Sequence, residues 1–267
     1  MRFSIRHETT YQYGTRVQYS IQQLRQTPSN TPSQFVIRWN IDAPNKLANS
    51  YDTYGNILHT LVLTRPHQSI RLMVEGEIET VALQDGRLLE GAGRIPLPHF
   101  TCQTRLTLPN EALTKMAADA GPLVTPDQLV SLAQQIGGRV EYRTGITAVT
   151  STAAEALALG NGVCQDHAHL MLALCRARGL PARYVSGYVD VGEVSDAASH
   201  AWVDVWLEDA GWVAVDVSHA CFASEKYCRV AVGRDYESAA PVRGMRVGGG
   251  EEELEVTVAV DQVVTNQ

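Results

Sequence analysis

The hydrophobic pattern of this chain changes once, close to Pro109, and that change limits the folds that the chain can adopt. Before it, apolar and polar residues alternate in strand-like runs without a helical period, at residues 3–13, 35–41, 57–63 and 70–83. After it, helical segments occur together with further strands. This pattern predicts an α+β protein in two parts. We expect a β-rich N-terminal domain at residues 1–105, packed as a sandwich or barrel, and a mixed domain at residues 106–267.

Composition and charge exclude several classes of partner. The net charge is −7 at pH 7, so the chain has no general attraction to nucleic acid or to anionic lipid. The first residues lack the apolar core of a signal peptide, and no window is apolar over the length of a transmembrane span. We therefore expect a cytoplasmic protein that binds neither nucleic acid nor membrane. Its five cysteines should be reduced there, and their odd number and scattered spacing fit no disulfide framework.

The second part is expected to contain short helices and one longer one. The short helices are expected at residues 111–120, 125–137 and 152–159. The segment Gly160–His167 opens the longer helix, with Cys164 within its first turn, and the helix ends near Arg178. One of its faces is apolar and includes Cys164 together with residues 168, 171, 172 and 175. This spacing predicts that the face bearing Cys164 is buried.

Two strands joined by a short turn carry a histidine and an aspartate. His200 opens the expected strand 200–207, and Asp216 lies near the end of the expected strand 211–217. If the two strands pair antiparallel, both side chains come to the same end of the sheet and can interact. The midpoint between them, residue 208, lies slightly before the centre of the turn. An offset or a bulge is therefore needed to bring His200 and Asp216 together.

Cys164 is the cysteine whose position favours chemistry. In the first turn of a helix, unpaired N–H groups and the helix dipole stabilise a thiolate. A free cysteine is also commonly a small buried residue, and position alone leaves both interpretations open. A thiolate facing an imidazole that a carboxylate holds is the nucleophile, base and orienting group of covalent catalysis. The spacing of Cys164, His200 and Asp216 permits this arrangement.

Four ordered blocks resemble the bacterial transglutaminase-like superfamily: Asn161–Ala168, Arg178–Tyr188, Ser199–Trp202 and Gly211–Asp216. The resemblance implies a papain-like α+β core with a Cys–His–Asp triad in this chain order. Cys164 would be the nucleophile, His200 the general base and acid, and Asp216 the residue that orients His200. The first hundred residues resemble the β-rich N-terminal domain often joined to this core. The segment Gly233–Tyr236 resembles one that follows the triad in the same proteins.

One departure from the family concerns the residue after Asp216. The family usually has a proline there, whereas this chain has Val217, followed by Ser218 and His219. The departure leaves the substrate range less defined than the triad. The backbone N–H of Cys164 is the natural first donor to a tetrahedral oxyanion, and we expect a second donor from the loop near Tyr142.

The resemblance implies acyl transfer through a thioester, and it covers peptidases, amide hydrolases and protein cross-linkers. We expect hydrolysis of amide or peptide bonds in a protein or peptide substrate. A protein-glutamine transamidase and a non-catalytic binding module that keeps the fold are the alternatives. No residue pattern indicates an oligomeric state.

We expect no cofactor and no metal. Cys164, His167 and His169, with His200 or His219, offer zinc-type ligand atoms. Their spacing does not bring them all together on one helix, so His167 and His169 are expected at the helix surface or partly buried.

Overall fold

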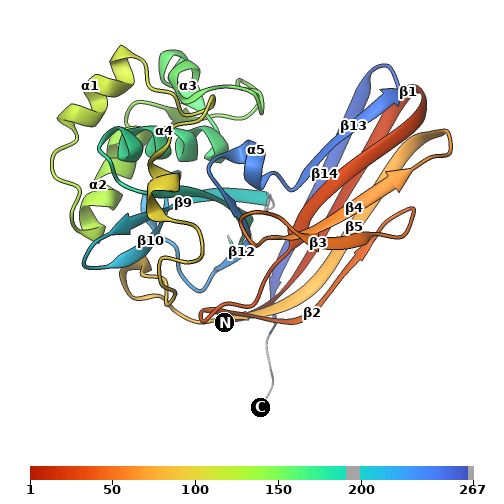
Figure 1. The fold of residues 1–267 in the computed structure, drawn as a ribbon, viewed down its shortest axis with the longest axis horizontal. Coiled ribbons are helices and arrows are strands. Elements are labelled where there is room, and N and C mark those ends of the chain that lie inside the picture. The colour runs from red at the N-terminus through yellow and green to blue at the C-terminus, as the bar shows by residue number, and fades with distance from the viewer. Residues whose placement is uncertain (191–198, 264–267) are drawn as a thin grey trace.

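The computed structural model describes residues 1–190 and 199–263 and has two lobes (Figure 1). One lobe is a sheet of long strands, and the other packs helices against a second sheet. The predicted α+β fold class, with a β-rich N-terminal region followed by a mixed core, is confirmed. Among the described residues, none of the helices is long and apolar enough to cross a membrane.

The first sheet is built around β1, a strand of 26 residues. Its order is β2-β5-β1-β4-β3, and β13 and β14 also pair with β1. The strands are β1 (Arg2–Thr27), β2 (Gln34–Asp42), β3 (Ala48–Tyr51), β4 (Ile57–Leu63), β5 (His67–Thr80), β13 (Val242–Gly248) and β14 (Glu252–Gln262). β1 continues well beyond the expected end at Tyr13, because its second half pairs with β4 and β13 where the hydrophobic alternation has stopped.

The end of the chain returns to this first sheet. β14 pairs antiparallel with the first half of β1, from Phe3↔Gln262 to Tyr13↔Glu252, and β13 pairs with the second half. The first sheet therefore includes residues 242–262, which the expected division at residue 105 assigned to the second domain. A strand pattern identifies a strand but not its partner, and pairing across the whole chain leaves no local signal.

The second lobe is a five-stranded sheet with helices on one face (Figure 1). Its strand order is β11-β10-β9-β8-β12, and a short parallel pair joins β6 to β7. The strands are β6 (Glu141–Tyr142), β7 (Asn161–Gly162), β8 (Ala182–Val189), β9 (Ser199–Leu207), β10 (Gly211–Asp216), β11 (Cys221–Phe222) and β12 (Tyr227–Gly233). The helices are α1 (Glu111–Asp119), α2 (Pro126–Gly137), α3 (Ala153–Leu159), α4 (Cys164–Ala177) and α5 (Tyr236–Ala239), with 3₁₀ turns at Gln84–Gly86 and Leu97–Thr101.

α4 lies at the centre of this lobe. It packs against β8 and β9 on one side and against α1, α2 and α3 on the other. Every residue from Gln165 to Arg176 is buried, so burial extends beyond the single apolar face that the sequence predicts. His167 and His169, expected at the surface or partly buried, are both buried. The helices that cover α4 leave it no solvent-facing side after its first turn.

The segment Gly233–Tyr236 closes the end of the lobe next to α4. Asp235 caps the short helix α5 by accepting a hydrogen bond from Ser238 N at 3.2 Å. Tyr236 N donates to His169 Nε2 at 3.2 Å. Burial lowers the pKa of His169 to about 4, which keeps the imidazole neutral and able to accept this bond. The segment therefore contacts α4 through this hydrogen bond.

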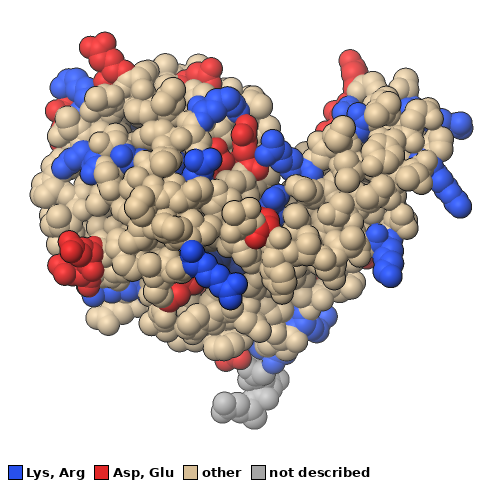
Figure 2. Space-filling view, in the orientation of Figure 1, with Lys and Arg blue, Asp and Glu red and all other residues tan. Residues whose placement is uncertain are grey.

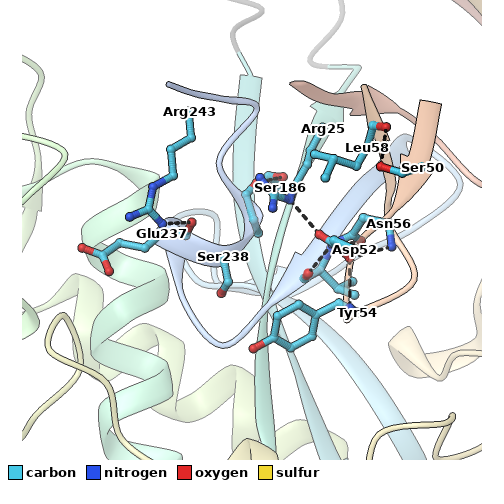
Figure 3. A network of polar contacts seen from close by, with 12 residues as sticks. Arg25, Ser50, Asp52, Tyr54, Asn56, Leu58, Ser186, Glu237, Ser238 and Arg243 are labelled. Atoms are coloured by element: carbon cyan, nitrogen blue, oxygen red, sulfur yellow. Dashed lines mark hydrogen bonds and ion pairs between the residues drawn. The ribbon is translucent and has the colours of Figure 1, made fainter. Parts of the chain in front are cut away.

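The two lobes meet through a polar network around Asp52 (Figure 3). Asp52 Oδ2 accepts from Arg25 Nε at 2.7 Å, and Oδ1 accepts from the backbone N–H groups of Tyr54 and Asn56. The Asn56 side chain then makes two bonds of 2.8 Å to the backbone of Val232 on β12. Beside this contact, a cavity of about 760 Å³ opens between the lobes, in the hollow visible in Figure 2.

Gly187 on β8 is a position where the second sheet admits no side chain. A Cβ atom there would lie 2.0 Å from the carbonyl oxygen of Cys228 and 2.7 Å from Trp202 Cη2. We expect Gly187→Ala to destabilise the protein by about 3 kcal/mol, measured by urea unfolding. Gly137→Ala is the control, because a Cβ there meets nothing within 4 Å and should leave stability unchanged or slightly higher. Equal stability of the two variants would contradict the expectation.

Candidate active site

Cys164 is the first residue of α4 and so lies in the first turn, where the sequence predicts it. Asp166 caps the helix, because its Oδ2 accepts from Val163 N at 2.8 Å and from Thr147 Oγ1 at 2.6 Å. A Cβ on Gly162 would lie 2.7 Å from the Cβ of Asp166, so the capping turn requires glycine at this position. Cys164 is partly exposed, whereas Cys175 and Cys228 are buried. Its thiol therefore lies at a helix N-terminus that solvent can reach.

His200 and Asp216 meet across the pair β9 and β10. The ladder between these strands aligns Val215 with Val203 and Ala214 with Asp204. Continued by one step, this register sets Asp216 opposite Trp202 and makes His200 its diagonal neighbour on the same face. His200 and Asp216 are thus two residues out of register with each other, which is the offset that the sequence requires. Between Gly211↔Leu207 and Val215↔Val203 the ladder has no bulge. His200 Nε2 lies 2.7 Å from Asp216 Oδ2.

The electrostatics of the pair favour a charged imidazole. Burial alone would lower the pKa of His200, but hydrogen bonds to Asp216 and Cys164 outweigh it and raise the pKa to about 10. For Asp216, burial works against ionisation, and hydrogen bonds from His200 and His219 hold the pKa of the carboxyl well below its usual range. Because Nε2 of His200 faces Asp216, Nδ1 is the nitrogen left for Cys164. The structure thus brings the three residues singled out in the sequence to one place.

Asp216 has more partners than the sequence predicts. Oδ1 accepts from the backbone N–H groups of Ser218 and His219, at 3.0 and 3.1 Å. Oδ2 accepts from His219 Nδ1 at 2.7 Å and from the Tyr227 hydroxyl at 2.8 Å, in addition to His200. Sequence reasoning missed His219 and Tyr227 as partners of Asp216. His219 follows Asp216 by only three residues, and this short spacing was the signal in the sequence that the two could interact. Tyr227 lies on β12, and no pattern in the sequence indicates its contact with Asp216.

Two tryptophans share a strand face with the candidate residues, and only Trp202 lies beside them. Its ring stacks near His200 with centroids 6.4 Å apart, and it meets Tyr227 edge-on at 5.3 Å. Trp212 instead packs under the Arg183 guanidinium, whose Cζ lies 4.3 Å from the ring centroid. Trp202 is buried and shields one side of the His200 imidazole from water.

Tyr142 lies at the loop that the sequence indicates for a second oxyanion donor. Its strand β6 pairs with β7, with Tyr142 opposite Gly162, just before Cys164. Burial, the charge of Cys164 and a side-chain hydrogen bond to Cys164 together raise the pKa of Tyr142 to about 12. The hydroxyl therefore stays protonated at neutral pH and can donate a hydrogen bond next to the thiol.

One group of described residues has the composition of a metal site. The ligand atoms of His200, Asp216 and His219 lie within 4.8 Å of one another. The same atoms are joined by two hydrogen bonds of 2.7 Å, which account for their convergence without an ion. His167 and His169 do not join this group. His167 contacts Val140 O and Ser218 Oγ, at 3.0 and 3.2 Å.

Two family models match the chain in the order of its two regions. The bacterial transglutaminase-like N-terminal region matches residues 3–79, and the transglutaminase-like superfamily matches residues 112–217. The second range contains Cys164, His200 and Asp216.

Relatives of similar length are known from mycobacteria. An uncharacterized protein of Mycobacterium leprae is 29% identical over 278 residues, covering 98% of this chain and 99% of that protein. An uncharacterized protein of Mycobacterium tuberculosis is 30% identical over 292 residues, covering 98% of this chain and 92% of that protein. A protein-glutamine gamma-glutamyltransferase of Pseudomonas aeruginosa is 37% identical over 68 residues, which cover 22% of this chain and 10% of that enzyme.

The whole fold recurs in a solved structure. A protein of Cytophaga hutchinsonii, described as a "Putative Cysteine Protease", superposes with a TM-score of 0.81 at 20% sequence identity. The match covers 100% of this chain and 92% of that one, so both lobes and their arrangement are shared. With both family regions matched in order and the fold shared along its whole length, the chain belongs to the transglutaminase-like superfamily and carries the bacterial N-terminal region of that family.

Proposed function

We propose that this protein is a cysteine-dependent acyl-transfer enzyme that hydrolyses amide or peptide bonds in a protein or peptide substrate. Cys164 is the nucleophile, His200 the general acid and base, and Asp216 the residue that orients His200. The observation that carries the proposal is a partly exposed thiol at a helix N-terminus, beside an imidazole that a buried carboxylate holds at 2.7 Å. The coarser conclusion, a cysteine-based acyl-transfer enzyme, follows from the family itself.

The first half of the reaction forms a thioester. The Cys164 thiolate attacks the acyl carbon, and the carbonyl oxygen gains negative charge as the tetrahedral intermediate forms. In this proposal the backbone N–H of Cys164 and the Tyr142 hydroxyl, which interacts with the Cys164 thiol, stabilise that charge. His200, charged through its bonds to Asp216 and Cys164, donates its proton to the leaving nitrogen as the C–N bond breaks. The amine departs and the acyl group stays on sulfur.

The second half returns the enzyme to its starting state. Neutral His200 accepts a proton from water, and the water oxygen bonds to the acyl carbon. The C–S bond breaks, the acid is released, and the thiolate and the imidazolium are restored. If a primary amine replaces water in this step, the same groups form a new amide. Protein-glutamine transamidation is therefore the second candidate, supported by the similarity to the Pseudomonas aeruginosa enzyme over 68 residues.

A product assay distinguishes the two reactions. We expect casein incubated with the protein to release new N-termini or ammonia without an added amine, measured by mass spectrometry and an ammonia assay. Cys164→Ala should reduce either product by at least about a hundredfold, because the covalent route is lost. Cys102→Ala, which removes an exposed thiol outside the site, should keep full activity. Incorporation of a fluorescent primary amine without net hydrolysis would favour the transamidase, and a Cys164→Ala variant as active as wild type would reject both.

The compartment and the partners are part of the same proposal. A thiolate enzyme needs a reduced nucleophile, and all five cysteines are free. We propose a cytoplasmic enzyme whose partner is its protein or peptide substrate, without a role for nucleic acid, membrane, cofactor or metal.

A further inference from the structure

Asp216 binds two imidazoles through one oxygen. His200 Nε2 and His219 Nδ1 each lie 2.7 Å from Oδ2, and the two ring centroids are 5.3 Å apart. The two histidines differ in their access to water. The side chain of His200 is 8% exposed, whereas that of His219 is 52% exposed. One imidazole therefore faces the thiol and the other faces solvent, with a shared carboxylate between them.

The turn between β10 and β11 fixes His219 in this position. Asp216 pairs with Cys221 in the ladder, so the residues between them must reverse the chain. Ala220 has φ 49°, a left-handed conformation that alanine rarely adopts. Ser218 Oγ lies 3.2 Å from His167 Nδ1, which ties the turn to α4. A turn held in an unfavourable conformation and attached at both ends points to a specific requirement for the side chain that it carries.

We propose that His219 is a positioning residue for His200, which holds Asp216 from the solvent side and adds a positive charge beside the catalytic pair when the pH falls. The proposal rests on the proposed function, because it assumes that His200 serves Cys164. His219 itself contacts no reacting atom. It acts through the carboxylate that it shares.

The hydrogen-bond chemistry defines where His219 titrates. An ionised carboxylate only accepts hydrogen bonds, so Nδ1 of His219 keeps its hydrogen in both charge states. The proton is gained and lost at Nε2, on the other side of a half-exposed ring. The hydrogen bond to Asp216 therefore persists while the charge changes. The hydrogen bond to Asp216 raises the pKa of His219, while burial and repulsion from His200 oppose this increase.

The sign of the effect follows from the surrounding charges. Below its raised pKa, His219 is positive and repels the imidazolium of His200, which eases proton release to the leaving nitrogen. The same positive charge favours a negative sulfur on Cys164. Above that pKa, His219 is neutral and only the hydrogen bond remains. The titratable groups that interact with His200 or Asp216 from the surrounding elements are Tyr227, Cys221, His167, Cys164 and Tyr142.

The test compares two substitutions by the rate at which iodoacetamide alkylates Cys164 between pH 4 and 9. His219→Ala removes both the hydrogen bond and the charge, and should slow alkylation at pH 7 about threefold to tenfold. His219→Asn keeps an N–H donor for Asp216 and should restore the rate above the pKa of His219, where the histidine is neutral. Below the pKa of His219 the asparagine variant should still be slower, with its acid midpoint higher by about half a pH unit to one unit. A purely structural role would not separate the two variants by pH.

Controls separate this inference from the proposed function. His67→Gln changes a histidine on β5 of the other sheet and should keep the wild-type profile, and thermal unfolding verifies that each variant is folded. If both His219 variants keep the wild-type profile while His200→Ala loses the reactivity, His219 has no positioning role and the proposed function stands. If wild-type Cys164 reacts no faster than Cys102 at any pH, the proposed function fails first.

Discussion

Cys164 is expected to react with iodoacetamide at a pH well below that at which an ordinary thiol, with a pKa of about 8.5, becomes reactive. Its sulfur lies at the N-terminus of α4, and it faces His200, whose imidazole is positive through its bonds to Asp216 and Cys164. At pH 5 the rate at Cys164 should exceed that at Cys102 on the order of tenfold.

His200→Ala should abolish that advantage. Without the imidazolium, Cys164 retains only the helix terminus, and its alkylation should follow pH as that of an exposed cysteine does. Peptide mass spectrometry measures Cys164 and Cys102 in the same sample, so the exposed Cys102 thiol is an internal control. Asp216→Asn should give a partial loss, because His200 keeps its place but loses its charged partner. If Cys164 behaves like Cys102 in wild type, or if His200→Ala changes nothing, the binding-module alternative becomes the better one.

The local part of the site could be predicted from the sequence. The position of Cys164 in the first turn of a helix follows from the glycines before it and from the apolar spacing after it, and α4 begins at this residue. The hairpin of β9 and β10 follows from two alternating runs around a turn. The need for an offset was visible from the midpoint of His200 and Asp216, because a ladder fixes which residues can oppose each other.

What lies around the site could not be predicted in the same way. His167 and His169 are polar residues on a helix with one obvious apolar face, and the sequence places them outside it. Their burial depends on helices that cover α4 from other parts of the chain. The contact of Tyr227 with Asp216 likewise depends on where β12 lies at the edge of the sheet. Partners that are distant in sequence leave no local pattern.

The largest loss of stability is expected from a carboxylate outside the candidate active site. Asp204 on β9 is fully buried and accepts three hydrogen bonds from two arginines. Arg183 Nε donates at 2.7 Å, and Arg229 donates through Nη1 and Nη2 at 2.8 and 2.7 Å. Burial opposes ionisation of Asp204, but Arg229 and Arg183 outweigh it and lower the pKa of the carboxyl. The aspartate thus compensates two guanidinium groups that the fold has removed from water.

Asp204→Ala should destabilise the protein by about 3–5 kcal/mol, because it leaves both guanidinium groups without this carboxylate. Because the pKa of Asp204 is lowered in the folded state, its contribution is complete above the usual pKa of about 3.9 and is lost as the pH falls through the lowered value. Urea unfolding at pH 7 measures the loss. Asp119→Ala is the matched control, since its pair with Lys115 is exposed and should be worth about 1 kcal/mol or less.

The effect of Asp204 should also reach the contact between the lobes. Arg229 N donates to Gln34 Oε1 at 2.8 Å, and the Gln34 amide donates to Arg229 O at 2.9 Å, so the residue that Asp204 holds also joins β12 to β2. If the lobes unfold as one unit, Asp204→Ala should shift a single urea transition. If the substitution separates them, the transition should split in two, with β1 to β5 retained longer. A loss no larger than that of Asp119→Ala would mean that water reaches the two arginines, and the network would then carry neither stability nor the coupling between the sheets.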